Sequence, residues 1–191
     1  MVVCVLAGGM GKRIGMRKAL VKIFNRTLIE IAVDRARALS DTVVVSCGKF
    51  RIEGLPVEQV EDVKGEGPMA GIFSILLRYP KVLFFPVDMP FLTVDVLKRL
   101  WDESWSSPVV VASAGGFLFP TVGVYSDSVV GIMEACIDSR RYSLKGFLDS
   151  VDGVKVVDFS YVDHVHRVFL NINTWEDLRV AEGWFKNGGC I

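Results

Sequence analysis

Residues 2–19 read VVCVLAGGMGKRIGMRKA, and this stretch decides the fold. Its first six residues are apolar and rich in β-branched side chains, which favours a buried strand. Gly8 and Gly9 follow, and glycine lets the backbone turn tightly and approach a ligand closely. Successive backbone N–H groups in such a loop can surround phosphate oxygens. Because Arg13 and Lys18 add positive charge nearby, the stretch predicts a strand that leads into a phosphate-binding loop.

Strand-like and helix-like segments alternate along the rest of the chain. The expected strands are 2–7, 42–47, 57–60, 82–87, 109–112, 117–125, 154–159 and 168–172. The expected helices are 27–39, 68–78, 93–101, 126–137, 143–150 and one that begins with the capping-box pattern TWED at 174–177. This alternation predicts a three-layer, Rossmann-like α/β fold, with a mostly parallel sheet between two layers of helices. Residues beyond 115 are richer in strands, and we expect them to add a β-ribbon and further strands at an edge of the sheet.

Length and composition limit the class of protein. The chain has 191 residues without a repeat or linker, so we expect one domain, 1–191. Its 22 basic side chains balance 22 acidic ones, which argues against a nucleic-acid partner. No apolar stretch reaches the roughly 18 residues that span a bilayer, so no membrane partner is expected. The four cysteines have neither zinc-site nor disulfide spacing, which favours a cytoplasmic location.

Three kinds of phosphate-binding loop compete for the glycine-rich stretch. The P-loop pattern G-x-x-x-x-G-K-[ST] fails because Arg13 follows Gly11 and Lys12, where a metal-binding hydroxyl belongs. The dinucleotide-binding pattern G-x-G-x-x-G fails because Ile14 occupies the third glycine position. The pattern L-A-G-G-x-x-x-R-[MI]-G-x-x-K fits residues 6–18 without a gap.

Asp88 is the strongest candidate for a metal ligand. It follows the apolar run 82–87, and ligands of open α/β sheets bind at the carboxyl ends of the strands. The glycine-rich loop leaves the first strand at the same edge. Since Mg²⁺ binds through one or two carboxylates together with phosphate oxygens and water, we expect Asp88 to hold Mg²⁺ beside a bound phosphate. An aspartate in this position can also serve only as a helix cap.

Two further groups of residues carry polar or small side chains next to predicted elements. Asn171 and Asn173 can complete a metal shell or orient an acceptor phosphate, although Asn173 can equally cap the helix after it. The loop GEGPMAG, residues 65–71, allows a base or ribose to approach closely, because its side chains are small. Asp62, just before this loop, can accept a hydrogen bond from the same ligand. His164 and His166 are expected on a surface turn, without a third metal ligand.

Four blocks of the chain together resemble the molybdenum cofactor guanylyltransferase family of nucleotidyltransferases. They are LAGGMGKRIGMRK at 6–18, GPMAG at 67–71, PVDMPF at 86–91, and NINT at 171–174 with EDL at 176–178. The resemblance covers residue 3 to about 178. It implies the nucleotidyltransferase fold and the transfer of GMP from GTP to the terminal phosphate of molybdopterin, with Mg²⁺ as cofactor and pyrophosphate as product. It also implies GTP and molybdopterin as partners, with transient contacts to other cofactor-biosynthesis proteins.

The resemblance implies roles for individual residues, with residues 1–115 binding the nucleotide and 116–191 binding the acceptor. The nucleotide residues would be Leu6, Ala7, Gly8, Gly9, Gly11, Lys18, Asp62, Gly67 and Asp88. The acceptor residues would be Asn171, Asn173, Arg140 and Arg141, with Pro120-Thr121 in a similar acceptor-side segment. Arg13 and Lys18 would neutralise the leaving pyrophosphate, and Asp88 would hold the metal.

Three alternatives remain open at this point. Gly48 stands where the family commonly has an asparagine near the guanine, so base selection is left to backbone groups or other residues. A cytidylyltransferase for molybdopterin and a guanylyltransferase for a cobamide phosphate therefore stay as alternatives. The third is a non-catalytic nucleotide-sensing module, although intact Lys18 and Asp88 argue against it.

Overall fold

Seven strands form the central sheet of the computed structural model, which describes residues 1–11 and 14–186. From one edge to the other they are β11 (Lys155–Asp158), β9 (Val109–Ala114), β10 (Phe117–Ser126), β8 (Lys81–Pro86), β1 (Val2–Leu6), β6 (Thr42–Gly48) and β7 (Glu58–Glu61). The helices are α1 (Leu28–Arg37), α2 (Gly67–Leu76), α3 (Val94–Asp102), α4 (Val130–Asp138), α5 (Leu144–Leu148), α6 (Val165–Val168) and α7 (Trp175–Lys186). Between β1 and α1 lie β2 (Met10–Gly11), β3 (Met16–Arg17), the 3₁₀ turn η1 (Lys18–Leu20), β4 (Lys22–Ile23) and β5 (Arg26–Thr27).

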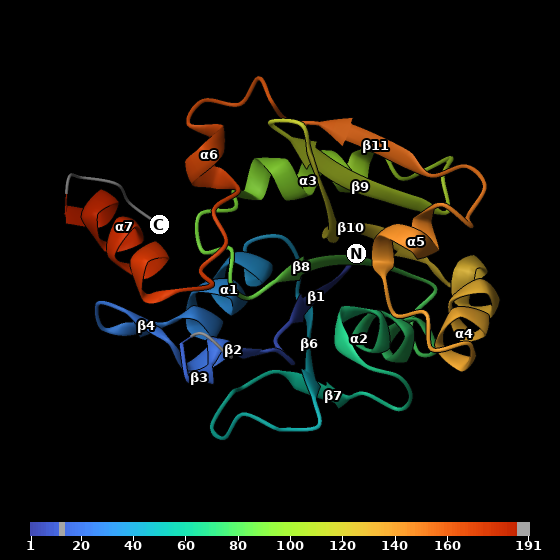
Figure 1. Ribbon diagram of the computed structural model, residues 1–191, viewed down its shortest axis with the longest axis horizontal. Helices are drawn as coiled ribbons and strands as arrows, with labels where there is room; N and C mark the ends of the chain where they lie inside the picture. Colours follow the sequence, from blue (N-terminus) through green and yellow to red (C-terminus); the bar gives the residue numbers. More distant parts are fainter. Residues whose placement is uncertain (12–13, 187–191) are drawn as a thin grey trace.

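Two layers of helices cover the sheet, and Figure 1 shows them on its opposite sides. Helices α1, α3, α6 and α7 share one core with Val3 and Val5 of β1. Helices α2, α4 and α5 share the other core with Cys4 and Leu6 of the same strand. The sheet is parallel except for β10, which runs antiparallel to both of its neighbours. The predicted three-layer, mostly parallel α/β fold is therefore confirmed.

Helices begin where the sequence signals indicate. The Thr27 hydroxyl accepts a hydrogen bond from the backbone N–H of Glu30, and the Glu30 carboxylate accepts one from the Thr27 N–H, so α1 opens with a capping box. Pro68 lies in the first turn of α2, where the missing N–H costs nothing. No helix in the described part of the chain combines the length and apolar character of a membrane span.

Two expectations about the second half of the chain are wrong. Strand β10 lies inside the sheet, between β8 and β9, rather than adding to an edge. Its second half is buried on both faces, because Val124 packs in one core and Tyr125 in the other. Residues 168–172 form no strand: Val168 ends α6, and the chain then runs without regular structure. Strand β11 does lie at an edge, as expected.

Gly123 marks a close contact between β10 and β9, and we expect Gly123→Ala to lower the free energy of unfolding by about 1–3 kcal/mol. A Cβ at this position would lie 2.3 Å from the Val110 carbonyl oxygen, so the backbone itself must move. Urea denaturation measures the loss. The control is Gly131→Ala in α4, where nothing lies within 4 Å of the added Cβ, and this change should be neutral or slightly stabilising. Equal stability of the two variants would contradict the argument.

Candidate functional site

The side chains of Lys18, Asp88 and Asn173 meet at the carboxyl ends of the central strands. Lys18 follows β3, Asp88 follows β8, and Asn173 precedes α7. The Lys18 Nζ lies 2.5 Å from Asp88 Oδ2 and 2.5 Å from Asn173 Oδ1. Since the Lys18 and Asp88 side chains are only 18% and 14% exposed, the ion pair is largely shielded from solvent. Three segments that are distant in sequence thus converge on one charged point.

One backbone hydrogen bond fixes the asparagine segment beside Asp88. The Ile172 N–H donates to the Asp88 carbonyl oxygen over 2.8 Å. The Ile172 side chain is fully buried in the core, whereas Asn171 lines the neighbouring cavity and Asn173 accepts from Lys18. An apolar residue between two asparagines thus anchors the segment and leaves both amides on the cavity side.

Asp177 holds the same segment from the first turn of α7. Its Oδ2 accepts the backbone N–H groups of Asn173 and Thr174 over 2.9 and 2.8 Å, and its own N–H donates to the Thr174 hydroxyl over 3.1 Å. This confirms the capping box predicted at 174–177. Burial raises the pKa of the Asp177 carboxyl, but the hydrogen bonds from Asn173 and Thr174, together with the charge of Lys18, outweigh burial and hold the pKa below its usual 3.8.

We expect Asp177→Ala to lower the free energy of unfolding by about 1 kcal/mol at pH 7, as loss of a helix cap does. Because the folded-state pKa is depressed, this stabilisation is present above pH 3.8 and is lost as the pH falls through the folded-state value. Urea denaturation at several pH values should therefore show wild type and variant converging in acid. Glu176→Ala, an exposed change in the same turn, is the control. A difference that persists unchanged below the folded-state pKa would contradict the assignment.

A cavity of about 260 Å³ opens beside the Lys18–Asp88 pair. Among the residues singled out from the sequence, the lining contains Leu6, Gly8, Gly9, Lys18, Asp62, Gly67, Asp88 and Asn171. The other lining residues are Ser46, Pro68, Gly71, Pro86, Val87 and Thr121, of which Thr121 belongs to the predicted acceptor-side segment. The cavity therefore extends along the carboxyl edge of the sheet, from the loops after β6 and β7 to the bulge in β10.

The glycine-rich loop reaches this cavity after a last sheet contact. The Ala7 N–H donates to the Ser46 carbonyl over 2.8 Å, so that amide is engaged in the sheet and is not available to a ligand. A Cβ at Gly8 would lie 3.0 Å from the backbone nitrogen of Gly48, which itself has a φ of +67°. Both glycines are explained by this close approach, including Gly48 where the family commonly has asparagine.

Asp62 and Ser46 form the wall at the β6–β7 end of the cavity. Burial raises the pKa of the Asp62 carboxyl, while the Ser46 hydroxyl and the Lys49 charge act in the opposite direction. The Ser46 hydroxyl donates to Asp62 Oδ1 over 3.4 Å. Sequence reasoning did not identify Ser46 as a site residue, because one hydroxyl inside an apolar strand resembles a core position. Its only signal was a polar side chain in the otherwise apolar run 42–47.

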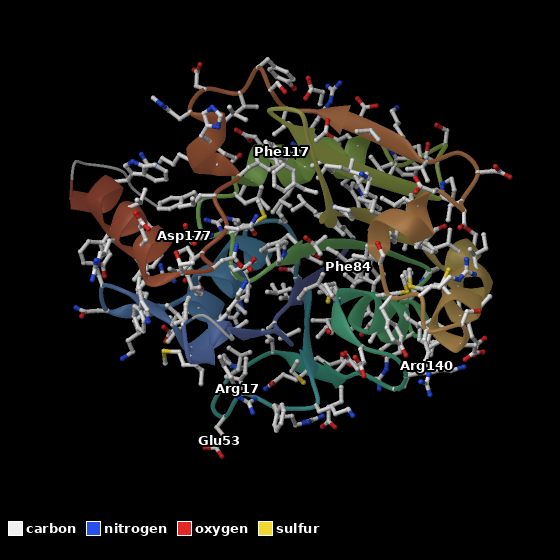
Figure 2. The ribbon with its side chains drawn as sticks, in the orientation of Figure 1. Arg17, Glu53, Phe84, Phe117, Arg140 and Asp177 are labelled. Carbon is white, nitrogen blue, oxygen red and sulfur yellow. The ribbon has the colours of Figure 1, made fainter. Side chains whose placement is uncertain are left out.

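The structure does not bring every predicted residue to the cavity. Arg140 and Arg141 are exposed after α4 and are absent from the lining; Figure 2 shows Arg140 beside α4, on the opposite side of the view from Asp177. Ala7 is buried in the core, and Gly11 lies in β2. Arg13 lies outside the described residues.

Asp88 has the character of a ligand for a cation. Its Oδ1 is buried, and no group in the described part of the chain donates a hydrogen bond to it. The described residues contain no group of three or more His, Cys, Asp or Glu side chains able to hold a metal by themselves. One carboxylate with nearby amide oxygens is instead the donor set that suits Mg²⁺ bound together with phosphate.

Comparisons with known proteins agree with this arrangement. The family profile described as the MobA-like NTP transferase domain matches residues 3–154. A probable molybdenum cofactor guanylyltransferase from Halalkalibacterium halodurans is 30% identical over 91% of this chain and 93% of its own length. A molybdenum cofactor guanylyltransferase from Shewanella woodyi is 29% identical over 90% of each chain.

A solved structure gives the same result for the fold. The crystal structure of molybdopterin-guanine dinucleotide biosynthesis protein A from Archaeoglobus fulgidus superposes with a TM-score of 0.85. It is 27% identical, and the match covers 98% of this chain and 100% of that one. The glycine-rich loop and Asp88 lie at one sheet edge, the profile matches most of the chain, and the relatives match almost end to end. The chain therefore belongs to the MobA-like NTP transferase family.

Proposed function

We propose that the protein transfers GMP from GTP to the terminal phosphate of molybdopterin and releases pyrophosphate, using Mg²⁺. The observation that carries the proposal is the convergence of Lys18, Asp88 and Asn173 beside a cavity that the glycine-rich loop also lines. The names of the relatives support the choice of guanine and molybdopterin. Residues 1–115 would bind the nucleotide and 116–191 the acceptor, in one catalytic unit.

The two substrates have separate places along the sheet edge. Asp62 and Gly67 line the end of the cavity beside β6 and β7, which suits the base and ribose. Thr121 and Asn171 line the end beside β10, which suits the acceptor phosphate. Since Asp88 follows β8, between these two ends, the α-phosphorus and the attacking phosphate oxygen would meet beside it.

The chain's own residues account for the charge changes of the reaction. An acceptor phosphate oxygen forms a bond to the α-phosphorus as the bond from that phosphorus to the pyrophosphate oxygen breaks. Lys18 would donate hydrogen bonds to the phosphate chain and offset its growing charge, as Arg13 would on the leaving side. Amides from Gly8 onward would hold phosphate oxygens. Mg²⁺ on Asp88, with Asn171 or Asn173 nearby, would supply further positive charge at the α-phosphate.

Pyrophosphate release tests the proposed function. The protein is incubated with Mg²⁺ and molybdopterin and with either GTP or CTP, and pyrophosphate is measured. Release with GTP and little with CTP is expected. Preference for CTP would indicate a cytidylyltransferase, release only with a cobamide phosphate would indicate that acceptor, and no release with any nucleotide would indicate a sensing module.

Because Cys4, Cys47 and Cys136 are free thiols, we place the activity in a reducing cytoplasm.

A further inference from the structure

A second, aromatic cavity lies beyond the acceptor end of the first. It measures about 140 Å³ and is formed where the β9–β10 turn faces α6. Its walls include Phe117, Phe119 and Phe169 together with His166, and the backbone of Gly115 closes one side. We call the space that these residues line the aromatic cavity. None of them has a part in the nucleotide chemistry described above.

Two chain segments lead directly from the aromatic cavity to the reaction centre. Phe119 lines the aromatic cavity and Thr121, two residues later in β10, lines the first cavity. In the segment before α7, Phe169 likewise lines the aromatic cavity and Asn171 lines the first cavity. The two cavities are therefore neighbours on the acceptor side, whereas Asp62 marks the far, nucleotide end.

Strand register gives the distance between the aromatic cavity and Asp88. Phe84 of β8 lies level with Val111 of β9, with Gly123 of β10 between them. Asp88 follows the carboxyl end of β8 and Gly115 follows that of β9, and these two ends are two strand spacings apart, which is roughly 10 Å. A ligand whose phosphate reacts beside Asp88 can therefore reach the aromatic cavity with a group that is separated from the phosphate by one ring.

The aromatic cavity has the shape and chemistry of a site for a flat ring. The Phe119 and Phe169 rings lie 4.8 Å apart between centroids. Phe117 is 72% exposed and lies at the outer end of the β9–β10 hairpin (Figure 2), so an incoming ring would cover it. An apolar cavity of about 150 Å³ accepts benzene, so the volume suits one ring of a fused pair, and the second ring would lie over the exposed Phe117.

We propose that the aromatic cavity binds the pterin ring system of the acceptor, which rests on the proposed function. A pyran ring and a CH₂–O link separate the pterin of molybdopterin from its phosphate, and this separation matches the span between the two cavities. A pterin has flat faces that stack on phenylalanine rings and polar edges that hydrogen-bond. The exposed imidazole of His166 lies against the Gly115 turn and can donate to or accept from such an edge.

The test compares Phe117→Ala with Trp105→Ala, which removes another highly exposed aromatic ring after α3, away from both cavities. At saturating GTP, Phe117→Ala should raise the KM for molybdopterin about tenfold; with GTP varied at saturating molybdopterin, the KM for GTP should stay unchanged. Adding His166→Ala should raise the KM for molybdopterin further. Trp105→Ala should match wild type. If wild type turns over and Phe117→Ala has the wild-type KM for molybdopterin, the assignment is overturned.

A binding measurement separates this inference from the proposed function. Free pterin is titrated with protein alone, and quenching of pterin fluorescence reports stacking. Binding by wild type and Trp105→Ala that weakens about tenfold in Phe117→Ala supports the cavity even if no acceptor is turned over. Absence of pterin binding by wild type overturns the cavity, even if GMP transfer to molybdopterin is observed. Absence of pyrophosphate release from wild type counts against the proposed function alone.

Discussion

Replacing Asp88 with alanine is expected to reduce the rate of GMP transfer by about two to three orders of magnitude. Removing one group that stabilises transition-state charge in an active site has an effect of this size. Asp88 supplies the buried Oδ1 that receives no hydrogen bond within the described residues, and it pairs with Lys18 through Oδ2. Its removal would take away the proposed Mg²⁺ ligand and the negatively charged partner of Lys18. Pyrophosphate release at saturating GTP and molybdopterin measures the loss.

The fold should survive this change, because Asp88 lies at the end of a strand and its backbone carbonyl still receives the Ile172 N–H. The urea midpoint should therefore stay close to that of wild type. Asp102→Ala, which removes an exposed carboxylate from the last residue of α3, should keep full activity. Near-normal turnover of Asp88→Ala at saturating Mg²⁺ would show that the metal ligand lies elsewhere.

Replacing Lys18 with alanine is expected to raise the KM for GTP by one to two orders of magnitude. Charge-assisted hydrogen bonds contribute about 1.5–3 kcal/mol, and Lys18 is the described cation that lines the cavity beside Asp88. Steady-state kinetics with varied GTP and fixed molybdopterin measure the change. If the lysine also acts on the charge that develops during reaction, kcat falls together with kcat/KM.

Lys22→Ala provides the matched control for this second experiment. Lys22 is exposed in β4, four residues further along, and is absent from the cavity lining. The variant should have the wild-type KM for GTP. Should Lys18→Ala also keep the wild-type affinity and rate, the role given to Lys18 would have to be abandoned.

The parallel half of the fold could be predicted because its signals are local. The run 42–47 has the apolar centre Val43–Val45, and 82–87 is apolar up to Asp88, so each predicts a strand buried on both faces. Strands β6 and β8 occupy these places on either side of β1. The glycine-rich loop and Asp88 leave neighbouring parallel strands at the same end, so the register of β1 with β8 brings them together.

The remaining features depend on contacts between distant residues. The place of β10 follows from pairing with β8 as well as β9, and no local pattern records the second partner. Val168, Phe169 and Ile172 are apolar because they are buried, yet the Ile172 N–H donates to the Asp88 carbonyl instead of to a strand. Apolar spacing reports burial without reporting the partner. For the same reason the sequence did not show that Arg140 is absent from the cavity lining.

The bond from Lys18 to Asn173 joins residues 155 positions apart, and this has a consequence for synthesis on the ribosome. The chain is synthesised from its N-terminus, so the first strand and its loop leave the exit tunnel long before the asparagines do. Until residue 173 has emerged, Lys18 lacks one of its two partners. A nascent chain that already holds β1, β6 and β8 would therefore remain catalytically incompetent, which pulse-labelled, ribosome-stalled chains can show.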